Sequence, residues 1–258
     1  MNLLPLEGKR VLVTRSAGQT AKLSDRLRAL GAIPVEVPVL EIVPPESYAP
    51  LDDALRHLDQ FDWLILTSTN TLREVSARCS LCAVNPADAM DLNVAAVGRA
   101  TAEAARHFGF RVAVVPDAQV AEGLVAALGE RVNGQRVLLP RAAAARDLIP
   151  DALRKAGADV EVVEAYRNVL PEAAPEQLKR AMVETIDAAT FTSSSSVTHL
   201  AEAARLAGIA FPLTEIPSIS IGPITSGTLR DLHWEPAVEA DPSDVPGLIA
   251  AVVHLFRG

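Results

Sequence analysis

Along this chain, short runs of apolar and β-branched residues alternate with longer segments in which the apolar positions follow a helical spacing. Leu23, Leu27 and Leu30 recur at intervals of four and three residues, which is typical of one buried helix face. Strands that alternate with such helices are typical of βαβ units and predict parallel sheets covered by helices. The predicted strands are residues 11–14, 35–37, 63–67, 94–97, 112–115, 137–139, 160–163, 188–192, 218–221 and 237–240.

Glycine marks the ends of several predicted helices. Gly31, Gly109, Gly157 and Gly208 each follow the last apolar position of a helical segment. A residue at this position often adopts the left-handed conformation, which glycine enters without steric cost. We therefore expect these glycines to end their helices.

The same order of segments occurs twice in the chain. GKRVLVTR at 8–15 returns as GQRVLLPR at 134–141, and FDWLILTSTNTL at 61–72 returns as IDAATFTSSSSV at 186–197, at offsets of 126 and 125 residues. VAAVGRATAEAAR and AEGLVAAL recur as SISIGPITSGTLR and VPGLIAAV, both at an offset of 124 residues. These offsets are far longer than a solenoid repeat and match the length of one domain. The sequence therefore predicts two similar α/β domains.

Two proline-rich stretches, at 38–50 and 164–175, occupy the same place in each repeat, just after its second strand. If both are linkers, the first remaining piece, 1–37, is too short to hold a core of its own. Joined to residues 176–258, it matches the length of the middle piece, residues 51–163. We therefore expect 1–37 plus 176–258 to form one discontinuous domain and 51–163 the other, with the linkers paired as a two-stranded β hinge.

Composition narrows the class of partner. The 258 residues carry a formal net charge of −8 and no basic run, which argues against nucleic acid or an anionic membrane as partner. A small anionic ligand is not excluded, because backbone amides and single arginines bind one regardless of net charge. No stretch reaches the roughly 20 apolar residues of a membrane span, and the N-terminus lacks the pattern of a cleaved signal. We therefore expect a cytoplasmic protein.

The two cysteines, Cys79 and Cys82, form a single CxxC pair just after a predicted helix at 71–78. A structural zinc site needs a second pair of ligands, and the five histidines show no ligand spacing. A redox CxxC normally begins a helix that follows a strand. We therefore interpret both cysteines as incidental residues near a helix end.

The carboxyl ends of the predicted strands are rich in small and hydroxyl-bearing residues that lead into helices. Open α/β sheets bind ligands at this edge, and free amides at helix N-termini bind anions. At a single loop the commoner role of such residues is an ordinary N-cap, but six such loops across both domains favour a polyanion site. The candidate binding residues are Thr14, Arg15, Ser68, Thr69, Asn70, Gly98, Arg99, Thr101, Arg141, Ser193, Ser194, Ser195, Gly222, Pro223 and Thr225.

Motifs for other chemistries are missing from the sequence. It contains neither GxGxxG nor a Walker A loop, so a dinucleotide or ATP has no recognisable site. The serine run at 193–196 lacks the GxSxG frame of a nucleophile elbow. We therefore expect a site that binds and orients its ligand and uses no cofactor and no metal.

Taken in order, these segments resemble the uroporphyrinogen-III synthase family over essentially the whole chain. The resemblance is carried by VLVTR, FDWLILTSTNTL, VAAVGRATAEAARHFGF, VVPDAQVAEGLVAAL, RVLLPRA, VEVVEAYRN, ATFTSSSSV, ISIGPITSGTLR and GLIAAV. Family members have two α/β domains joined by a two-stranded ladder. Two positions depart from the family pattern: Ser16 stands where many relatives have proline, and Ile224 where many have a second threonine. Thr225 or Ser226 must then supply any hydroxyl contact at the second position.

The resemblance implies a cyclising lyase of tetrapyrrole and haem biosynthesis. Its substrate, hydroxymethylbilane, is a linear tetrapyrrole with eight carboxylate side chains. Loss of the terminal hydroxyl as water, followed by closure through a spiro intermediate, inverts the last ring and gives uroporphyrinogen III. Because uncatalysed closure gives the non-inverted isomer, such an enzyme acts mainly by positioning. The resemblance also suggests transient coupling to hydroxymethylbilane synthase.

Tyr166, in the AYRN segment, is the catalytic residue that the resemblance implies. It would project toward the site and donate a proton to the leaving hydroxyl, since a phenol is protonated at neutral pH. Packing at a strand end is the other role open to this residue.

Two functions of other classes remain open from the residues alone. A two-domain cytoplasmic sensor or binding protein for a small polyanion would share the same loops, although regulators usually carry a DNA-binding segment. A two-domain glycosyl or phosphoryl transferase would need a nucleotide or metal motif, and none is visible.

Overall fold

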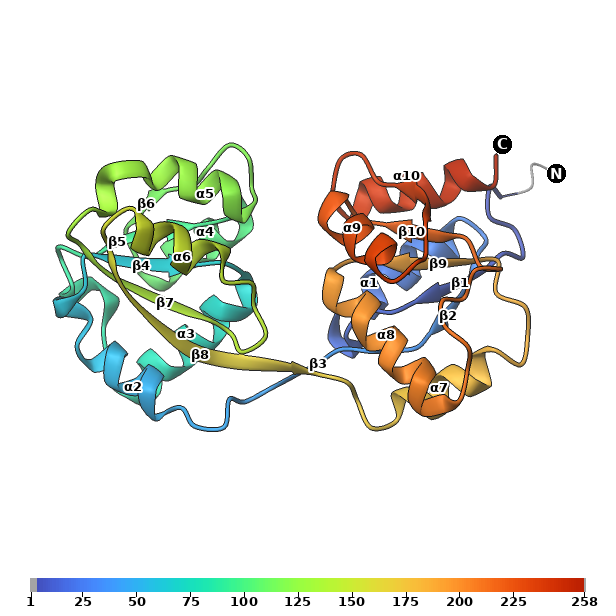
Figure 1. Ribbon diagram of the computed structural model, residues 1–258, viewed down its shortest axis with the longest axis horizontal. Helices are drawn as coiled ribbons and strands as arrows, with labels where there is room; N and C mark the ends of the chain where they lie inside the picture. Colours follow the sequence, from blue (N-terminus) through green and yellow to red (C-terminus); the bar gives the residue numbers. More distant parts are fainter. Residues whose placement is uncertain (1–3, 258) are drawn as a thin grey trace. The chain divides into compact units, whose positions relative to one another are not determined.

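The computed structural model describes residues 4–257, and the side chains of all of these except residues 17–20. The chain forms two compact α/β units (Figure 1). Residues up to Ile42 and from Asn168 onward form the discontinuous unit, and Val43–Arg167 form the continuous unit. The two boundaries fall inside the stretches 38–50 and 164–175.

The discontinuous unit contains a five-stranded parallel sheet in the order β11-β10-β9-β1-β2. Its elements are β1 (Arg10–Val13), α1 (Ala17–Ala29), β2 (Ile33–Glu36), α7 (Ala174–Ala181), β9 (Ala188–Phe191), α8 (Ser194–Ala207), β10 (Ser218–Ser220), α9 (Pro223–Asp231), β11 (Pro236–Glu239) and α10 (Val245–Leu255).

The continuous unit contains a six-stranded sheet in the order β3-β8-β7-β4-β5-β6, in which β8, β7, β4, β5 and β6 run parallel. Its elements are α2 (Ala49–Arg56), β4 (Trp63–Leu66), α3 (Thr69–Leu81), β5 (Asn93–Ala96), α4 (Arg99–Phe108), β6 (Val112–Val114), α5 (Ala121–Leu128), β7 (Arg136–Ala142) and α6 (Leu148–Lys155), with 3₁₀ turns at Leu58–Gln60, Pro86–Asp88 and Gly129–Val132. The strands β3 (Glu41–Val43) and β8 (Asp159–Val169) each cross a boundary between the units.

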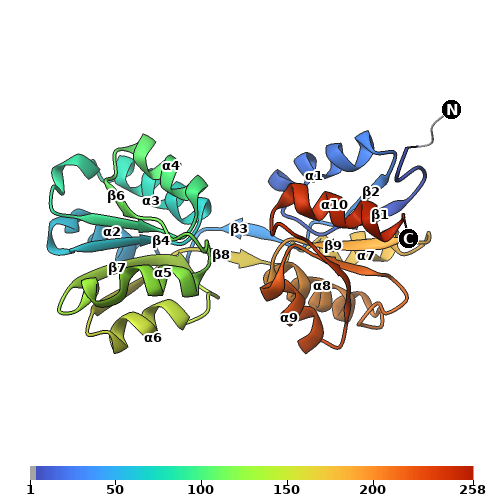
Figure 2. The same ribbon diagram turned by 90° about the horizontal axis from the view of Figure 1, so that it is seen from above.

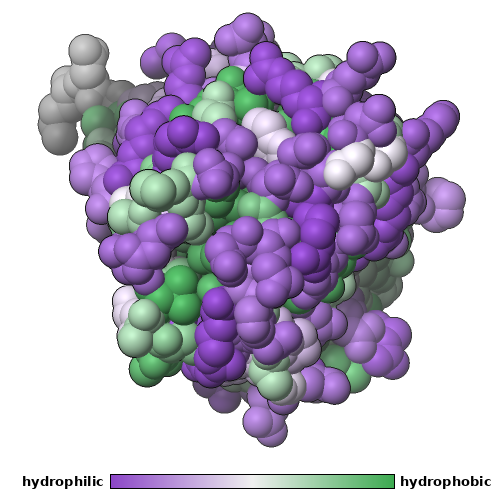
Figure 3. Space-filling view, turned by 90° about the vertical axis from the view of Figure 1, so that its left-hand side faces the viewer, coloured by the Kyte–Doolittle hydropathy of each residue, from purple (hydrophilic) through white to green (hydrophobic). Residues whose placement is uncertain are grey.

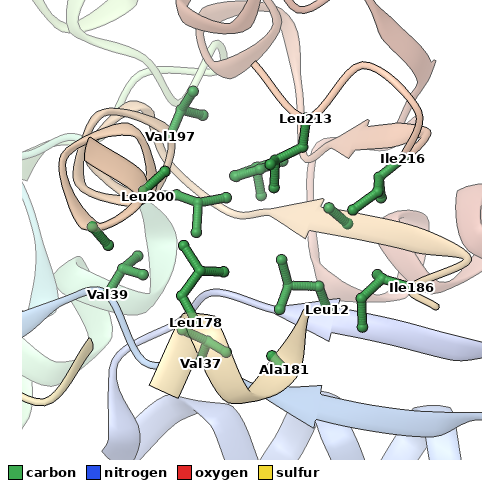
Figure 4. Close-up of a cluster of buried hydrophobic side chains, with 14 of the residues drawn as sticks. Leu12, Val37, Val39, Leu178, Ala181, Ile186, Val197, Leu200, Leu213 and Ile216 are labelled. Carbon is green, nitrogen blue, oxygen red and sulfur yellow. The ribbon is translucent and has the colours of Figure 1, made fainter. Parts of the chain in front are cut away.

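Successive residues of the central strands face opposite helical layers, as the period of a β-strand requires. In β1, Val11 and Val13 pack into a core that includes residues of α1 and α10. Leu12, between them, packs on the other face with Leu178 of α7 and Leu200 of α8 (Figure 4). Figure 2 shows the helices of each unit on both sides of its sheet. The expected fold class, two α/β domains with helix-flanked parallel sheets, is confirmed.

The repeat in the sequence is a repeat in the topology. Without β3, the two sheets have the same order when β1, β2, β9, β10 and β11 are matched to β7, β8, β4, β5 and β6. The matched Asp62 and Asp187 also have the same role. Each carboxylate accepts a backbone N–H at 2.8 Å, from Arg136 and from Arg10 respectively. The aspartate before each central strand therefore fixes the start of the strand next to it.

The glycine predictions are confirmed, because Gly31, Gly109, Gly157 and Gly208 all have positive φ, between 69° and 105°. Several elements are longer than predicted, among them the strand predicted at 137–139, which runs from Arg136 to Ala142 as β7. The predicted helix 71–78 runs from Thr69 to Leu81, and the strand predicted at 160–163 continues to Val169 as β8. Residues 164–166 remain extended because they still pair with the end of β7.

On the face of the continuous unit shown in Figure 3, hydrophobic side chains form small patches among hydrophilic ones. Of the helices within residues 4–257, none combines the length and the apolar character needed to cross a membrane.

Candidate active site

The carboxyl edge of each sheet is lined by helix N-termini. In the continuous unit, β4, β5, β6 and β7 are followed by α3, α4, α5 and α6. In the discontinuous unit, β9, β10, β11 and β1 are followed by α8, α9, α10 and α1. The first amides of a helix have no partner within it and carry the positive end of the helix dipole. Each sheet edge is therefore suited to receive carboxylates.

Ser68 and Tyr166 lie together at this edge of the continuous unit. Ser68 is the N-cap of α3 and its Oγ accepts the Thr71 amide at 3.1 Å. The Tyr166 hydroxyl lies 3.4 Å from the same oxygen, and only 6% of the tyrosine is exposed. A contact of 3.4 Å is long for an O–H···O bond. The phenol is thus held beside the first turn of α3 by its buried ring more than by this contact.

Ser193 has the same capping role in the discontinuous unit. It forms a capping box with Ser196 at the start of α8. Ser194 is also engaged, because its Oγ accepts from Thr228 Oγ1 at 2.7 Å and donates to the Ile224 carbonyl at 3.4 Å. Ser195 is partly exposed at the same turn. The ordinary capping role therefore holds for the hydroxyls of Ser68 and Ser193.

Gly98 and Gly222 are the N-caps of α4 and α9, and each lies close to a side chain from the next loop. The Arg99 amide donates to Gln119 Oε1 at 2.9 Å, and a Cβ at Gly98 would lie 3.3 Å from that oxygen. A Cβ at Gly222 would lie 2.5 Å from the Oγ of Ser243. Glycine at these positions lets a polar side chain approach the first amides of the helix.

Gln119 and Ser243 occupy matched positions at the repeat offset of 124 residues. Sequence reasoning did not select either residue. The offset itself was the available signal, because it also relates Gly98 to Gly222.

Three of the predicted threonines are almost fully buried. Thr14 has no exposed surface, and its Oγ1 donates to the Thr190 carbonyl at 2.8 Å. Its hydroxyl joins two strands, so the geometry does not support the predicted contact between this side chain and a substrate. Thr101 and Thr225 are 5% and 4% exposed. Both lie in the first turn of their helices, α4 and α9.

The predicted arginines lie in different surroundings. Arg15 follows β1 and is partly buried, which lowers the pKa of its guanidinium. Arg99 is exposed at the start of α4. Arg141 is near the end of β7, where it donates to Asp147 Oδ1 at 2.6 Å. The remaining candidates also lie at helix starts: Thr69 and Pro223 are exposed and Asn70 is partly exposed.

A pocket of 150 Å³ opens beside Arg141, and sequence reasoning missed it. Its lining residues come from the ends of β4 and β7, the starts of α5 and α6, and the loop before α6: Thr67, Ala121, Leu139, Arg141, Ala145, Arg146, Leu148, Ile149 and Pro150. In the sequence, Arg146 and Asp147 follow a run of alanines at 142–145, a segment without a recognisable motif.

The cysteine pair lies away from these residues, at the end of α3. Cys79 is buried inside the helix and Cys82 is its C-cap. Burial raises the pKa of the Cys79 thiol to about 12, so this sulfur is a poor nucleophile and a poor metal ligand. Among residues 4–257, His, Cys, Asp and Glu side chains form no group of three or more arranged to hold a metal ion.

A protein-family model matches most of the chain. The family model described as uroporphyrinogen-III synthase HemD matches residues 21–250. A uroporphyrinogen-III synthase of Synechococcus elongatus is 35% identical over 98% of this chain and 97% of its own length. A putative uroporphyrinogen-III synthase of Methanothermobacter thermautotrophicus is 33% identical over 93% of this chain and 96% of its own.

Solved structures agree on the fold. The crystal structure of a mutant uroporphyrinogen III synthase from the extremely thermophilic bacterium Thermus thermophilus matches with a TM-score of 0.72 and 18% identity, over 97% of this chain and 99% of that chain. At this identity the likeness concerns the fold alone, and the sequence relatives carry the relationship.

Proposed function

The chain belongs to the uroporphyrinogen-III synthase family, and we propose that it closes hydroxymethylbilane to uroporphyrinogen III, with loss of water and inversion of the last pyrrole ring. The observation that carries the proposal is 35% identity to a family member over nearly the full length of both chains. The residues at the carboxyl edges of the sheets suit this reaction, because they offer hydrogen-bond donors without a nucleophile.

Binding of the substrate would rest on backbone amides. The chain is acidic overall, with a net charge of −8, so its global field does not attract a polycarboxylate. Short-range donors at the helix N-termini, together with Arg15, Arg99 and Arg141, would do so locally. Because these donors are spread over several helices, they would fix the shape of a long, flexible substrate. Such fixing favours one ring closure over another.

Tyr166 is the proposed proton donor for the first step. The terminal hydroxyl takes a proton from the phenol and leaves as water, while the pyrrole nitrogen supplies the electron pair; loss of the pyrrole N–H proton, which returns to the phenolate, then gives the azafulvene. The buried phenol lies beside the N-terminus of α3. The positive end of that helix dipole would stabilise a phenolate left after the transfer.

Ring closure itself uses electrons of the substrate. The electron-rich last pyrrole attacks the azafulvene carbon through its own ring carbon that already carries a substituent. The resulting spiro intermediate then rearranges and loses a proton. The protein's part is to exclude the simpler attack, which gives the non-inverted isomer. It would do so by orienting that ring through its carboxylates.

Coupling the purified protein to a source of hydroxymethylbilane tests the proposal. The products are oxidised to porphyrins and the isomers are separated by chromatography. Isomer III should form faster than isomer I does without protein. Formation of isomer I alone would refute the proposal and return attention to a binding or sensor role.

We also propose a cytoplasmic location and transient coupling to hydroxymethylbilane synthase. The substrate closes spontaneously to the wrong isomer, so a short path between the two enzymes would be useful. Measuring the isomer I fraction while the two enzymes are diluted together at a constant ratio tests the coupling. An isomer I fraction that depends only on how much uroporphyrinogen-III synthase activity is present would argue against the coupling.

A further inference from the structure

The pocket beside Arg141 has an apolar wall built from two helices. Leu148, Ile149 and Pro150 begin α6, Ala121 begins α5, and Leu139 belongs to β7. All of these residues belong to the continuous unit. The pocket lies at the carboxyl edge of the sheet, where α/β folds bind ligands.

Two guanidinium groups line the same pocket, and both are held by carboxylates that are largely exposed. Arg141 pairs with Asp147 at 2.6 Å, and Arg146 pairs with Glu122 at 3.5 Å. The Arg141 side chain is 14% exposed, whereas that of Asp147 is 66% exposed. Asp147 and Glu122 are both exposed enough to be hydrated once released, and each arginine would keep a carboxylate partner. A ligand carboxylate could therefore replace Asp147 or Glu122 at small cost.

The volume limits what the pocket can hold. A pocket of 150 Å³ is comparable with an apolar protein cavity of about 150 Å³ that binds one benzene molecule. It fits one five-membered aromatic ring and is far too small for a tetrapyrrole. An apolar wall with cationic groups suits a flat ring with anionic side chains.

The pocket adjoins the proposed proton donor along the chain and across the sheet. Thr67 lines the pocket and precedes Ser68, whose oxygen lies 3.4 Å from the Tyr166 hydroxyl. Ala142, next to Arg141, is the strand partner of Tyr166. A ring in this pocket would thus be bound close to the residues proposed for the first step.

The pocket is not simply inherited from the repeated fold. At the offset of 126 residues, Leu148 and Pro150 correspond to Lys22 and Ser24 of the discontinuous unit. Ile149 and Leu139 correspond to the apolar residues Leu23 and Val13, so two positions of the wall change character between the units, and Arg141 is matched by Arg15.

We propose that this pocket binds one carboxylate-bearing pyrrole ring of the substrate, and that the carboxylates of that ring displace Asp147 from Arg141 and Glu122 from Arg146. The inference rests on the proposed function and adds to it a subsite for a single ring. Asp147 then acts as an internal competitor that occupies Arg141 until the substrate arrives.

Neutralising the competitor gives the sharpest test. Asp147→Asn should lower the KM for hydroxymethylbilane about two- to fivefold, the range that an exposed ion pair supports, with kcat nearly unchanged. Asp147 makes no side-chain cap to α6, so no cap is lost. The control is Asp151→Asn on the same helix, which removes the same charge beside Arg154. A KM that is unchanged or raised in Asp147→Asn would overturn the competition.

Filling the pocket is the second test. Ala145→Phe should raise KM at least tenfold, whereas Ala89→Phe, which fills a different pocket of the same unit, should not. Both variants are first compared with the wild type by thermal unfolding. A folded Ala145→Phe variant with the wild-type KM would contradict the ring site.

A direct binding measurement separates this inference from the proposed function. A monopyrrole with one acetate and one propionate side chain should shift the methyl resonances of Leu148 and Ile149 in the wild type and not in Ala145→Phe. If the wild type makes isomer III but the monopyrrole leaves these resonances unmoved, only the ring site is refuted. If the monopyrrole binds there but no isomer III forms, only the proposed function is refuted.

Discussion

At the scale of single residues, Tyr166 is the one side chain for which a chemical step is proposed. Its burial holds the phenol in place, and its contact with Ser68 at 3.4 Å is too long to fix the hydroxyl strongly. Water or a substrate carboxyl could therefore also deliver the proton. The barrier is already lowered by the pyrrole nitrogen, which expels the hydroxyl.

Tyr166→Phe should therefore slow the reaction by about tenfold, which is less than the roughly 10²–10⁴-fold loss typical of an indispensable proton donor. Most of the product should still be isomer III. Steady-state rates and isomer separation on the same samples measure both quantities. Tyr48→Phe is the matched control, because Tyr48 is the other tyrosine of the chain and donates to Glu74 instead. If the Tyr166→Phe variant folds but is inactive, the phenol is indispensable. If the variant has the wild-type rate, Tyr166 is a packing residue.

The two cysteines should differ in reactivity. Because burial raises the pKa of Cys79 to about 12, its thiol stays protonated at pH 8 and shielded from reagents. Cys82 is partly exposed at the C-cap of α3. Iodoacetamide at pH 8 should thus modify Cys82 first, with Cys79 following only after unfolding, as peptide mass spectrometry would show. Equal modification of both in the folded protein would contradict this assignment.

At the scale of elements, α2 and α3 are joined by a two-bond ion pair. Arg78 of α3 donates from Nε to Asp52 Oδ1 at 2.7 Å and from Nη2 to Oδ2 at 2.5 Å. Both side chains are largely buried, and Arg78 also lies over the ring of Tyr48. The hydrogen bonds from Arg78 lower the pKa of Asp52 below its ordinary value.

Because the pKa of Asp52 is lowered in the folded state, Asp52 stabilises the protein at pH values above its pKa in the unfolded chain, which is near 3.9. This stabilisation is lost as the pH falls through the pKa of Asp52 in the folded protein. Asp52→Asn should therefore reduce the free energy of unfolding at pH 7 by about 2 kcal/mol, since bonds to charged groups contribute about 1.5–3 kcal/mol. The difference from the wild type should shrink steadily below about pH 4. Urea unfolding at several pH values measures it.

Asp53→Asn is the control for this series. Asp53 is the next residue on α2 but its side chain is exposed, and it only approaches His57 at 3.7 Å. Its substitution should change stability by a few tenths of a kcal/mol at most. A deficit in Asp52→Asn that stays constant down to pH 2 would show that packing, and not charge, explains the loss.

The sequence predicted elements better than the orientation of side chains within them. Apolar periodicity located the strands, and the glycines located helix ends, because both signals depend on local geometry. The extension of β8 through Tyr166 was missed, since pairing with β7 and not local composition keeps that segment extended. Thr14 was placed correctly at a strand end, but its burial against Thr190 depends on a strand 176 residues away.

At the scale of the whole molecule, the duplicated sequence was the most informative signal. It predicted two similar α/β domains, and it matches Gly98 with Gly222 and Gln119 with Ser243. It could not predict the pocket beside Arg141, where Leu148 and Pro150 of one unit correspond to Lys22 and Ser24 of the other. Features of one unit alone are expected where the repeat diverges, in addition to the helix N-termini that both units share.

Removal of metals and small molecules should leave the activity of the whole molecule intact. In the proposed reaction the substrate supplies its own electron pair, a phenol supplies the proton and backbone amides bind the carboxylates. None of these steps needs a Lewis acid or an electron carrier. Protein treated with a chelator and then desalted should therefore convert hydroxymethylbilane at its original rate, with untreated protein desalted in parallel as the control. A loss of rate that zinc restores would contradict this expectation. Of the two cysteines, only Cys82 would then be a candidate ligand, because the buried Cys79 thiol, with its raised pKa, is ill suited to that role.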